Sequence, residues 1–224
     1  MRARGATDAT MKPGEPGVLD AGTRALVLVA AAVAKGRLPE LEARLTAARD
    51  AGVPSLWIEE LLLQSMLVVG YPLALVAFGA WRGVNGSSPP HQDAAEELAH
   101  ADWESWAARG AAVCRAVYGR AFHKLLLNLR ALHPALEDLV LVDAYGKVIG
   151  RPGLDLKRRE LTTIAATAVL GTAQQLHSHL RGALNVGATQ EEIEGVLRAI
   201  EGDLDSALRK TVWEQWEDVK RRKL

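Results

Sequence analysis

The side chains best suited to chemistry in this sequence lie between positions 145 and 181. His179 carries an imidazole, which can take up or release a proton near neutral pH. A side chain of this kind can act as a general acid and deliver a proton to a carbanion or an enolate. A histidine on a helix surface or at a helix interface is the alternative, and spacing alone favours it. His177 lies about 200° away around a helix, so the two rings are not expected to face one pocket or to chelate a metal ion together.

Two further residues could support this chemistry. Glu160 lies one predicted helix before His179 and could orient its imidazole or exchange a proton with it. The alternative is a first-turn carboxylate that the helix dipole favours. Tyr145 could form part of a pocket wall, although a tyrosine at such a place is more often a core residue with a satisfied hydroxyl.

Three arginines in the same region could hold the carboxylates of an acidic substrate through bidentate hydrogen bonds. Arg151 directly precedes Pro152-Gly153 in a predicted loop, where a binding side chain is plausible and a solvated arginine is the alternative. Arg181 lies close to His179 in sequence. Arg159 recurs as Arg24 in an internal repeat, so a structural ion pair suits it better.

The composition excludes several other kinds of site. Cys114 is the single cysteine, which rules out an intramolecular disulfide, a Cys-x-x-Cys pair and a zinc site with several cysteines. No metal site is predicted. Lys+Arg and Asp+Glu number 27 each, so no dedicated nucleic-acid-binding surface is expected. With 224 residues, of which 49% are hydrophobic, the chain can bury a sizeable core. We expect a soluble, cytoplasmic, alanine-rich helical protein.

Hydrophobic periodicity and helix-boundary residues predict an all-α protein. Asp155 is placed to cap a helix that ends at Gly171. A second helix is predicted over 172–186, and Thr189-x-x-Glu192 is a capping box that opens a third helix. The first two of these helices carry the candidate proton-transfer residues.

The longest apolar run, residues 61–81, has the length of a membrane span. Pro72 is predicted to break it into two short helices, which suits burial between protein neighbours better. No membrane partner is therefore expected. A linker is predicted at 85–90, followed by a helix from Gln92 and an amphipathic helix over 122–132.

The chain contains an internal repeat. A shift of 135 positions places residues 19–62 on residues 154–197 without a gap, and 14 of the 44 pairs are identical. Paired glycines such as Gly36 and Gly171 occur in register. Each predicted helix has an apolar face that must be buried away from water. Two copies of the unit packed face to face would bury these apolar faces. The sequence thus predicts two copies of one helical unit.

The second copy carries a resemblance to a known family. Residues 145–196, YGKVIGRPGLDLKRRELTTIAATAVLGTAQQLHSHLRGALNVGATQEEIEGV, resemble the carboxymuconolactone decarboxylase family. Its members are small all-helical proteins, among them cofactor-free decarboxylases and thiol peroxidases of the alkylhydroperoxidase D type. The resemblance extends more weakly over residues 19–82 through the repeat. It implies an all-α fold of two tandem units packed together, with no cofactor.

The resemblance also implies residue roles. The glutamate and the relay histidine of the peroxidase branch fall on Glu160 and His179, and its two cysteines fall on Thr172 and Gln175. Neither replacement can supply the thiolate that reduces a peroxide, so thiol peroxidase activity is disfavoured.

The two units are not equivalent in chemistry. The first copy has Ala25 and Arg44 where the second has the glutamate and the histidine, so only the second can form the relay. The chain also lacks the family's Gly-x-Pro break and apolar last helix at its end. The predicted organisation is a disordered tail (1–17), a degenerate first unit (18–84), a linker and helical insert (85–134), a second unit (135–205) and an amphipathic C-terminal helix (206–224).

The leading hypothesis is a cofactor-free lyase or related acid–base enzyme acting on a small carboxylated lactone or keto acid. His179 would be the general acid/base, Glu160 its partner and Arg151 a carboxylate anchor, with Tyr145 and Arg181 also binding substrate. The alternative is a non-catalytic binding or assembly protein of the same fold. By resemblance we expect a homo-oligomer, either a trimer or a hexamer-like ring.

Overall fold

The fold was determined as a computed structural model, which describes residues 19–86 and 102–222. Within these ranges every regular element is helical, which confirms the all-α prediction. The predicted tail, most of the linker and the start of the helix expected from Gln92 lie outside the described residues. The elements are α1 (Ala21–Lys35), α2 (Leu38–Asp50), α3 (Ser55–Asn85), α5 (Trp103–Tyr118), η1 (Gly119–Ala121), α6 (Phe122–Leu132), α7 (Leu136–Asp138), η2 (Leu139–Ile149), α8 (Leu156–Leu170), α9 (Ala173–Asn185), α10 (Gln190–Ala199), η3 (Glu201–Asp203) and α11 (Ser206–Arg221).

The internal repeat is visible in the helix boundaries. α1 and α8 have 15 residues each, α2 and α9 have 13 each, and all four begin and end at positions related by the shift of 135. Asp20 and Asp155 cap α1 and α8 by accepting a hydrogen bond from the backbone N–H three residues later. Gly36 and Gly171 end them in the left-handed conformation, with φ of 66° and 68°. The capping box at Thr189 opens α10 as predicted.

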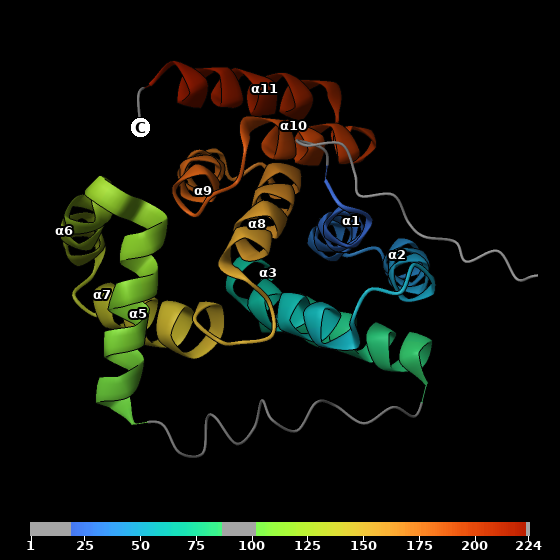
Figure 1. The fold of residues 1–224 in the computed structure, drawn as a ribbon, viewed down its shortest axis with the longest axis horizontal. Coiled ribbons are helices and arrows are strands. Elements are labelled where there is room, and N and C mark those ends of the chain that lie inside the picture. Colours follow the sequence, from blue (N-terminus) through green and yellow to red (C-terminus); the bar gives the residue numbers. More distant parts are fainter. Residues whose placement is uncertain (1–18, 87–101, 223–224) are drawn as a thin grey trace, which may run out of the picture.

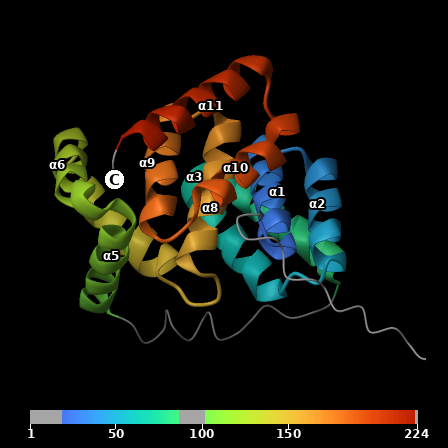
Figure 2. The ribbon, with the colours of Figure 1, turned by 45° about the horizontal axis from the view of Figure 1, so that its top comes forward.

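The two units pack on each other and share one core. α1 lies against α8, and α11 crosses over α9 and α8 (Figure 1, Figure 2). This arrangement buries the apolar faces of both copies, and the largest fully buried side chains include Trp81 in the first copy and Trp216 in α11. A second, smaller cluster holds the insert to the second unit and includes Cys114, Phe122 and Tyr145.

The apolar run lies in α3, which bends sharply. Gly70 has φ of 75° and ψ of 170°, so two helical segments meet there, two residues before Pro72. The proline lies in the first turn of the second segment, where its missing N–H is not needed. By length and composition α3 could cross a membrane, although Glu60 and Gln64 in it are buried and hydrogen-bonded to the protein. The absence of a membrane partner stays a prediction.

The insert crosses the second unit at very short range. α5 runs across η2, and glycine is required on both sides of the crossing. A Cβ atom at Gly110 would lie 1.8 Å from the carbonyl oxygen of Leu141, and one at Gly146 would lie 2.4 Å from that of Trp106. The helix predicted over 122–132 is α6, with the same bounds. The insert is therefore a packed part of the fold, held beside α9 (Figure 1).

Candidate active site

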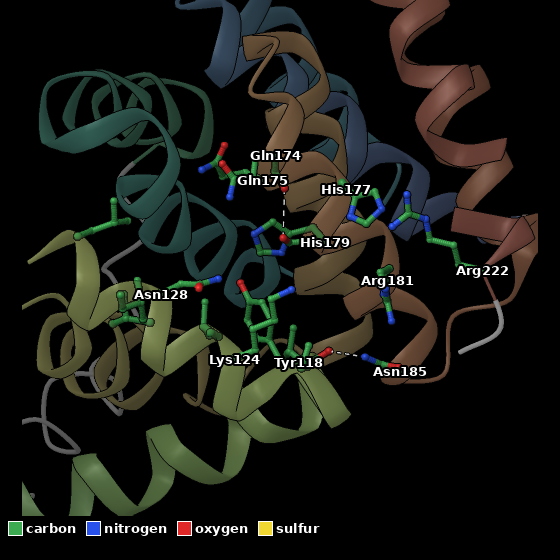
Figure 3. Close-up of a pocket in the computed structure, with 17 residues that line it drawn as sticks. Tyr118, Lys124, Asn128, Gln174, Gln175, His177, His179, Arg181, Asn185 and Arg222 are labelled. Atoms are coloured by element: carbon green, nitrogen blue, oxygen red, sulfur yellow. Dashed lines mark hydrogen bonds between the residues drawn. The ribbon is translucent and has the colours of Figure 1, made fainter. Parts of the chain in front are cut away.

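A cavity of about 490 Å³ lies between the insert and α9. Arg222, which directly follows α11, lies at its edge. Its volume falls in the range of small-molecule sites. Figure 3 shows its lining, which is mostly polar on the α9 side and mixed on the insert side. The lining residues are Val117, Tyr118, Ala121, Lys124, Leu125, Asn128, Leu129, Leu132, Val140, Gln174, Gln175, His177, Ser178, His179, Arg181, Asn185 and Arg222.

The predicted carboxyl–imidazole couple is in place at the wall of this cavity. The Nδ1 atom of His179, on α9, lies 2.9 Å from Oε2 of Glu160, on α8. The carboxyl side chain is 2% exposed and the imidazole is 18% exposed, so only the histidine faces the cavity. An ionised carboxylate can only accept a hydrogen bond, so Nδ1 of His179 is the nitrogen that donates to Glu160. Nε2 is then the nitrogen that accepts a proton on a neutral ring and donates one on a protonated ring.

Glycine makes room for this contact. Gly182 lies on α9 one turn after His179, and a Cβ atom there would lie 2.5 Å from Oε2 of Glu160. The same Cβ would lie 2.8 Å from Cγ1 of Val117 in the insert. The carboxylate is therefore enclosed by α9 and α5 together, which explains its burial.

Uncharged polar side chains surround the buried carboxylate. Burial raises the pKa of Cys114 to about 12, and the charge of Glu160 adds to the effect. Burial likewise raises the pKa of Tyr118 to about 12, although a hydrogen bond with Tyr145 opposes it. Both groups are neutral at physiological pH, so Cys114 supplies no thiolate and Tyr118 presents a phenol O–H at the cavity.

The structure corrects the expectation for Arg151. Its side chain is 2% exposed, does not line the cavity, and donates through Nε to both carboxylate oxygens of Glu60, at 3.1 and 3.3 Å. Gly153, with φ of 97°, packs against Glu60 and turns the loop inward, so the arginine lies under α3 instead of in solvent. Arg159 donates to the same carboxylate at 2.7 Å, which confirms the structural ion pair expected for it.

Of the other two residues expected to bind substrate, Arg181 lines the cavity and Tyr145 packs behind its lining. Tyr145 is 6% exposed, and its ring meets the ring of Tyr118 edge to face, with centroids 6.3 Å apart. It therefore supports a lining residue that the sequence did not single out.

The expectation that His177 and His179 could not face one pocket is wrong. Both line the cavity, because it is wide enough to extend around two faces of α9, as Figure 3 shows. Nε2 of His177 lies 3.6 Å from Oδ2 of Asp218 in α11. Burial and the charges of Arg222 and Arg181 lower the pKa of His177 in spite of this carboxylate.

Sequence reasoning missed the wall that the insert supplies. Tyr118, Lys124 and Asn128 all line the cavity opposite α9. The spacing of Lys124 and Asn128, four positions apart on α6, could have placed them on one face of a helix, but nothing in the sequence indicates which partner that face meets. Within the described residues, no group of three or more His, Cys, Asp and Glu side chains could hold a metal ion.

The place in the first unit that corresponds to the site is a smaller cavity. Its volume is about 270 Å³, and its lining includes Ala25 and Arg44, which replace the glutamate and the histidine. This lining holds neither a carboxyl group nor an imidazole. The proton-transfer couple is thus a property of the second copy.

Comparison with known proteins gives matches in both copies. The model of a family described as "Carboxymuconolactone decarboxylase family" matches residues 2–83 and 139–218, and leaves out 84–138, which hold α5 and α6.

Several curated proteins are similar in part. The chain is 29% identical over 143 residues to peroxisomal protein 2 of Schizosaccharomyces pombe, covering 62% of the chain and 66% of that protein. It is 33% identical over 75 residues to 4-carboxymuconolactone decarboxylase of Acinetobacter baylyi, covering 34% and 56%. It is 42% identical over 64 residues to a nitrosuccinic acid decarboxylase of Metarhizium robertsii, covering 28% and 45%. The matches span less than two thirds of the length of each of these relatives.

Proposed function

The chain belongs to the carboxymuconolactone decarboxylase family, and from this premise we propose that it is a cofactor-free acid–base enzyme that decarboxylates a small organic acid. One observation carries the proposal: the 2.9 Å contact of Glu160 with His179 at the wall of a 490 Å³ cavity. Two partial relatives with decarboxylase names support the reaction class. A carboxylated lactone or a keto acid is the substrate class we expect.

The proposed step needs only the protein's own side chains. The C–C bond to the leaving carboxylate breaks, CO₂ departs, and the electron pair is delocalised into a carbonyl of the substrate as an enolate. The imidazolium of His179 then delivers a proton from Nε2 to the carbon, and the ring regains a proton from water. Glu160 holds Nδ1 and stabilises the charged ring. Arg181 lies on the same cavity wall, where its charge would stabilise the enolate oxygen.

Thiol peroxidase activity stays disfavoured. Thr172 and Gln175 stand at the cysteine positions of the peroxidase branch, and the one thiol, Cys114, is buried with a pKa raised to about 12. A peroxidase needs a thiolate that a peroxide can reach.

A non-catalytic binding or assembly protein is the second candidate. The loss of the couple from the first unit favours it, as does an apolar strip on α3. Leu67, Tyr71, Leu75 and Val76 are between 40% and 66% exposed there. We propose that a second copy of the chain covers this strip in a homo-oligomer, which light scattering after gel filtration would test. The cytoplasmic location stays a prediction, and two partial relatives bear peroxisomal names.

The deciding experiment measures CO₂ release from a panel of β-keto acids and carboxylated lactones. We expect His179→Gln to lower kcat by about 10²- to 10⁴-fold, the usual contribution of a general acid, and Glu160→Gln to lower it in the same direction. His123→Gln is the matched control, because His123 is exposed on α6 and does not line the cavity. Equal rates for wild type and His179→Gln would remove His179 from the mechanism, and no turnover by the wild type would favour the non-catalytic candidate.

A further inference from the structure

The wall that faces the carboxyl–imidazole couple comes from a segment outside the family match. The matched residues end at 83 and resume at 139, whereas α5 and α6 lie between these positions. Lys124 and Asn128 lie one turn apart on α6, and Figure 3 shows both side chains reaching towards His179 from the opposite side of the cavity. This segment, which the family model does not match, is thus placed to contact the same ligand as the catalytic side chains.

The charges of the lining are not balanced. Arg222 donates through Nε to Oδ2 of Asp218 at 2.9 Å, so the positive charge of Arg222 is paired with a carboxylate of α11. In the described part of the chain, no ion pair joins Lys124 or Arg181 to a carboxylate. The two cations extend from opposite walls, one from α6 and one from α9. A ligand with two negative charges would complement both.

In a decarboxylation, the two negative charges of such a ligand have different fates. The carboxylate that leaves becomes neutral CO₂, so a cation that held it tightly would stabilise the ground state more than the transition state. The charge moves onto the enolate oxygen, where Arg181 can stabilise it throughout. A second carboxylate, which stays in the product, can be held firmly without slowing the reaction, and this binding positions the reacting carbon at His179.

We propose that Lys124 is the selectivity residue of this enzyme and binds the retained carboxylate of a small dicarboxylic acid, with Asn128 donating a second hydrogen bond to it. The inference rests on the proposed function, because the distinction between a leaving and a retained carboxylate exists only for a decarboxylase. Leu125 and Leu129 line the same face of α6 and would cover the hydrocarbon part of the ligand. The insert thereby restricts the site to dianions.

Binding of two acids of equal chain length tests this assignment without turnover. Succinate has two carboxylates and butyrate has one, and the affinity of each is measured by isothermal titration calorimetry at constant ionic strength. We expect the wild type to bind succinate at least ~10-fold more tightly, since a hydrogen bond to a charged group contributes on the order of a tenfold change or more. Lys124→Gln should bring the two affinities to within about 3-fold of each other.

Arg120→Gln is the matched control. Arg120 is also an exposed cation of the insert, four positions from Lys124, but it does not line the cavity. It should keep the wild-type preference. A Lys124→Gln protein that keeps the preference, a wild type without any preference, or an equal loss in Arg120→Gln would overturn the proposal. Lys124 is exposed, so its substitution should leave the thermal unfolding temperature unchanged.

His179→Gln separates this inference from the proposed function. It should lower kcat by the same factor of about 10²- to 10⁴-fold expected above and keep the preference for succinate. If kcat falls in His179→Gln but Lys124→Gln still prefers succinate, only the selectivity assignment is wrong. If Lys124→Gln loses the preference while His179→Gln turns over normally, the dianion site stands and the proton-transfer role fails.

Discussion

Nδ1 of His179 and Oε2 of Glu160 are 2.9 Å apart, although the two residues are 19 positions apart in the sequence. The turn at Gly171 brings α9 back along α8, so one residue from each helix meets at their interface. Gly182 leaves the space that the buried carboxylate occupies. The geometry of the couple therefore depends on a residue that has no side chain.

Gly182→Ala should damage the site and the fold together. The added methyl group would lie 2.5 Å from Oε2 of Glu160 and 2.8 Å from Val117, and neither neighbour can move far in a packed interior. We expect a loss of about 1–3 kcal/mol in the free energy of unfolding, measured by urea denaturation, together with a fall in CO₂ release.

A glycine in open space provides the control. A Cβ atom at Gly79, on the exposed side of α3, would meet nothing within 4 Å apart from its chain neighbours and the backbone of its own helix. Gly79→Ala should stabilise the protein by about 0.4–1 kcal/mol, because alanine restricts the unfolded chain and favours a helix. Similar destabilisation by both substitutions would show that the contact at Gly182 is not the cause.

Glu60→Gln should strongly destabilise the interface between the two units. The carboxylate of Glu60, on α3, accepts hydrogen bonds from Arg159 and Arg151, and all three side chains are at most 4% exposed. Loss of its charge leaves two guanidinium groups without this buried carboxylate. Breaking a buried pair in this way costs about 3–5 kcal/mol, which urea denaturation would measure.

The matched control is an exposed pair on α11. Nζ of Lys210 lies 3.8 Å from the carboxylate of Glu214, whose side chain is 64% exposed. Glu214→Gln should change the free energy of unfolding by less than about 0.5 kcal/mol. A comparably small change for Glu60→Gln would contradict a structural role for the buried cluster.

Cys114 should resist modification in the folded protein. Its side chain is buried, and burial raises its pKa from 9.0 to about 12, so little thiolate forms at pH 8. We expect negligible labelling by a thiol-specific disulfide reagent at pH 8 and full labelling in denaturant. Rapid labelling of the folded protein would contradict this burial.

The same shift predicts how stability depends on pH. The thiol of Cys114 has a higher pKa in the folded protein than in the unfolded chain. Its contribution to the free energy of unfolding is therefore fully present below pH 9.0 and is lost as the pH rises towards 12. Urea denaturation at pH 8 and pH 10.5 should show this loss, and Cys114→Ala should reduce it. An unchanged pH dependence in the variant would assign the effect to other groups.

Local features of the sequence predicted the helical framework well. The helix ends at Gly36 and Gly171 and the cap at Asp155 depend on residues within one turn, so the sequence contains the information for them. The same holds for the repeat. The ion pair of Arg159 was inferred from its recurrence in both copies, since a residue kept where the chemistry is lost has a structural task.

The errors concern partners that are distant in the sequence. Arg151 was expected to meet a substrate and instead meets Glu60, 91 positions away. His177 was excluded from the pocket on the geometry of one helix, but the cavity also extends to residues of α6 and to Arg222, which follows α11.

The sequence by itself determined the helices, the duplication and the residues able to exchange a proton, because caps and helical periodicity act between neighbours in the chain. Only the tertiary structure decided which charges face a ligand. Burial and ion pairing depend on helices that meet across the fold, and the insert that closes the cavity carries no local signal of the surface it covers.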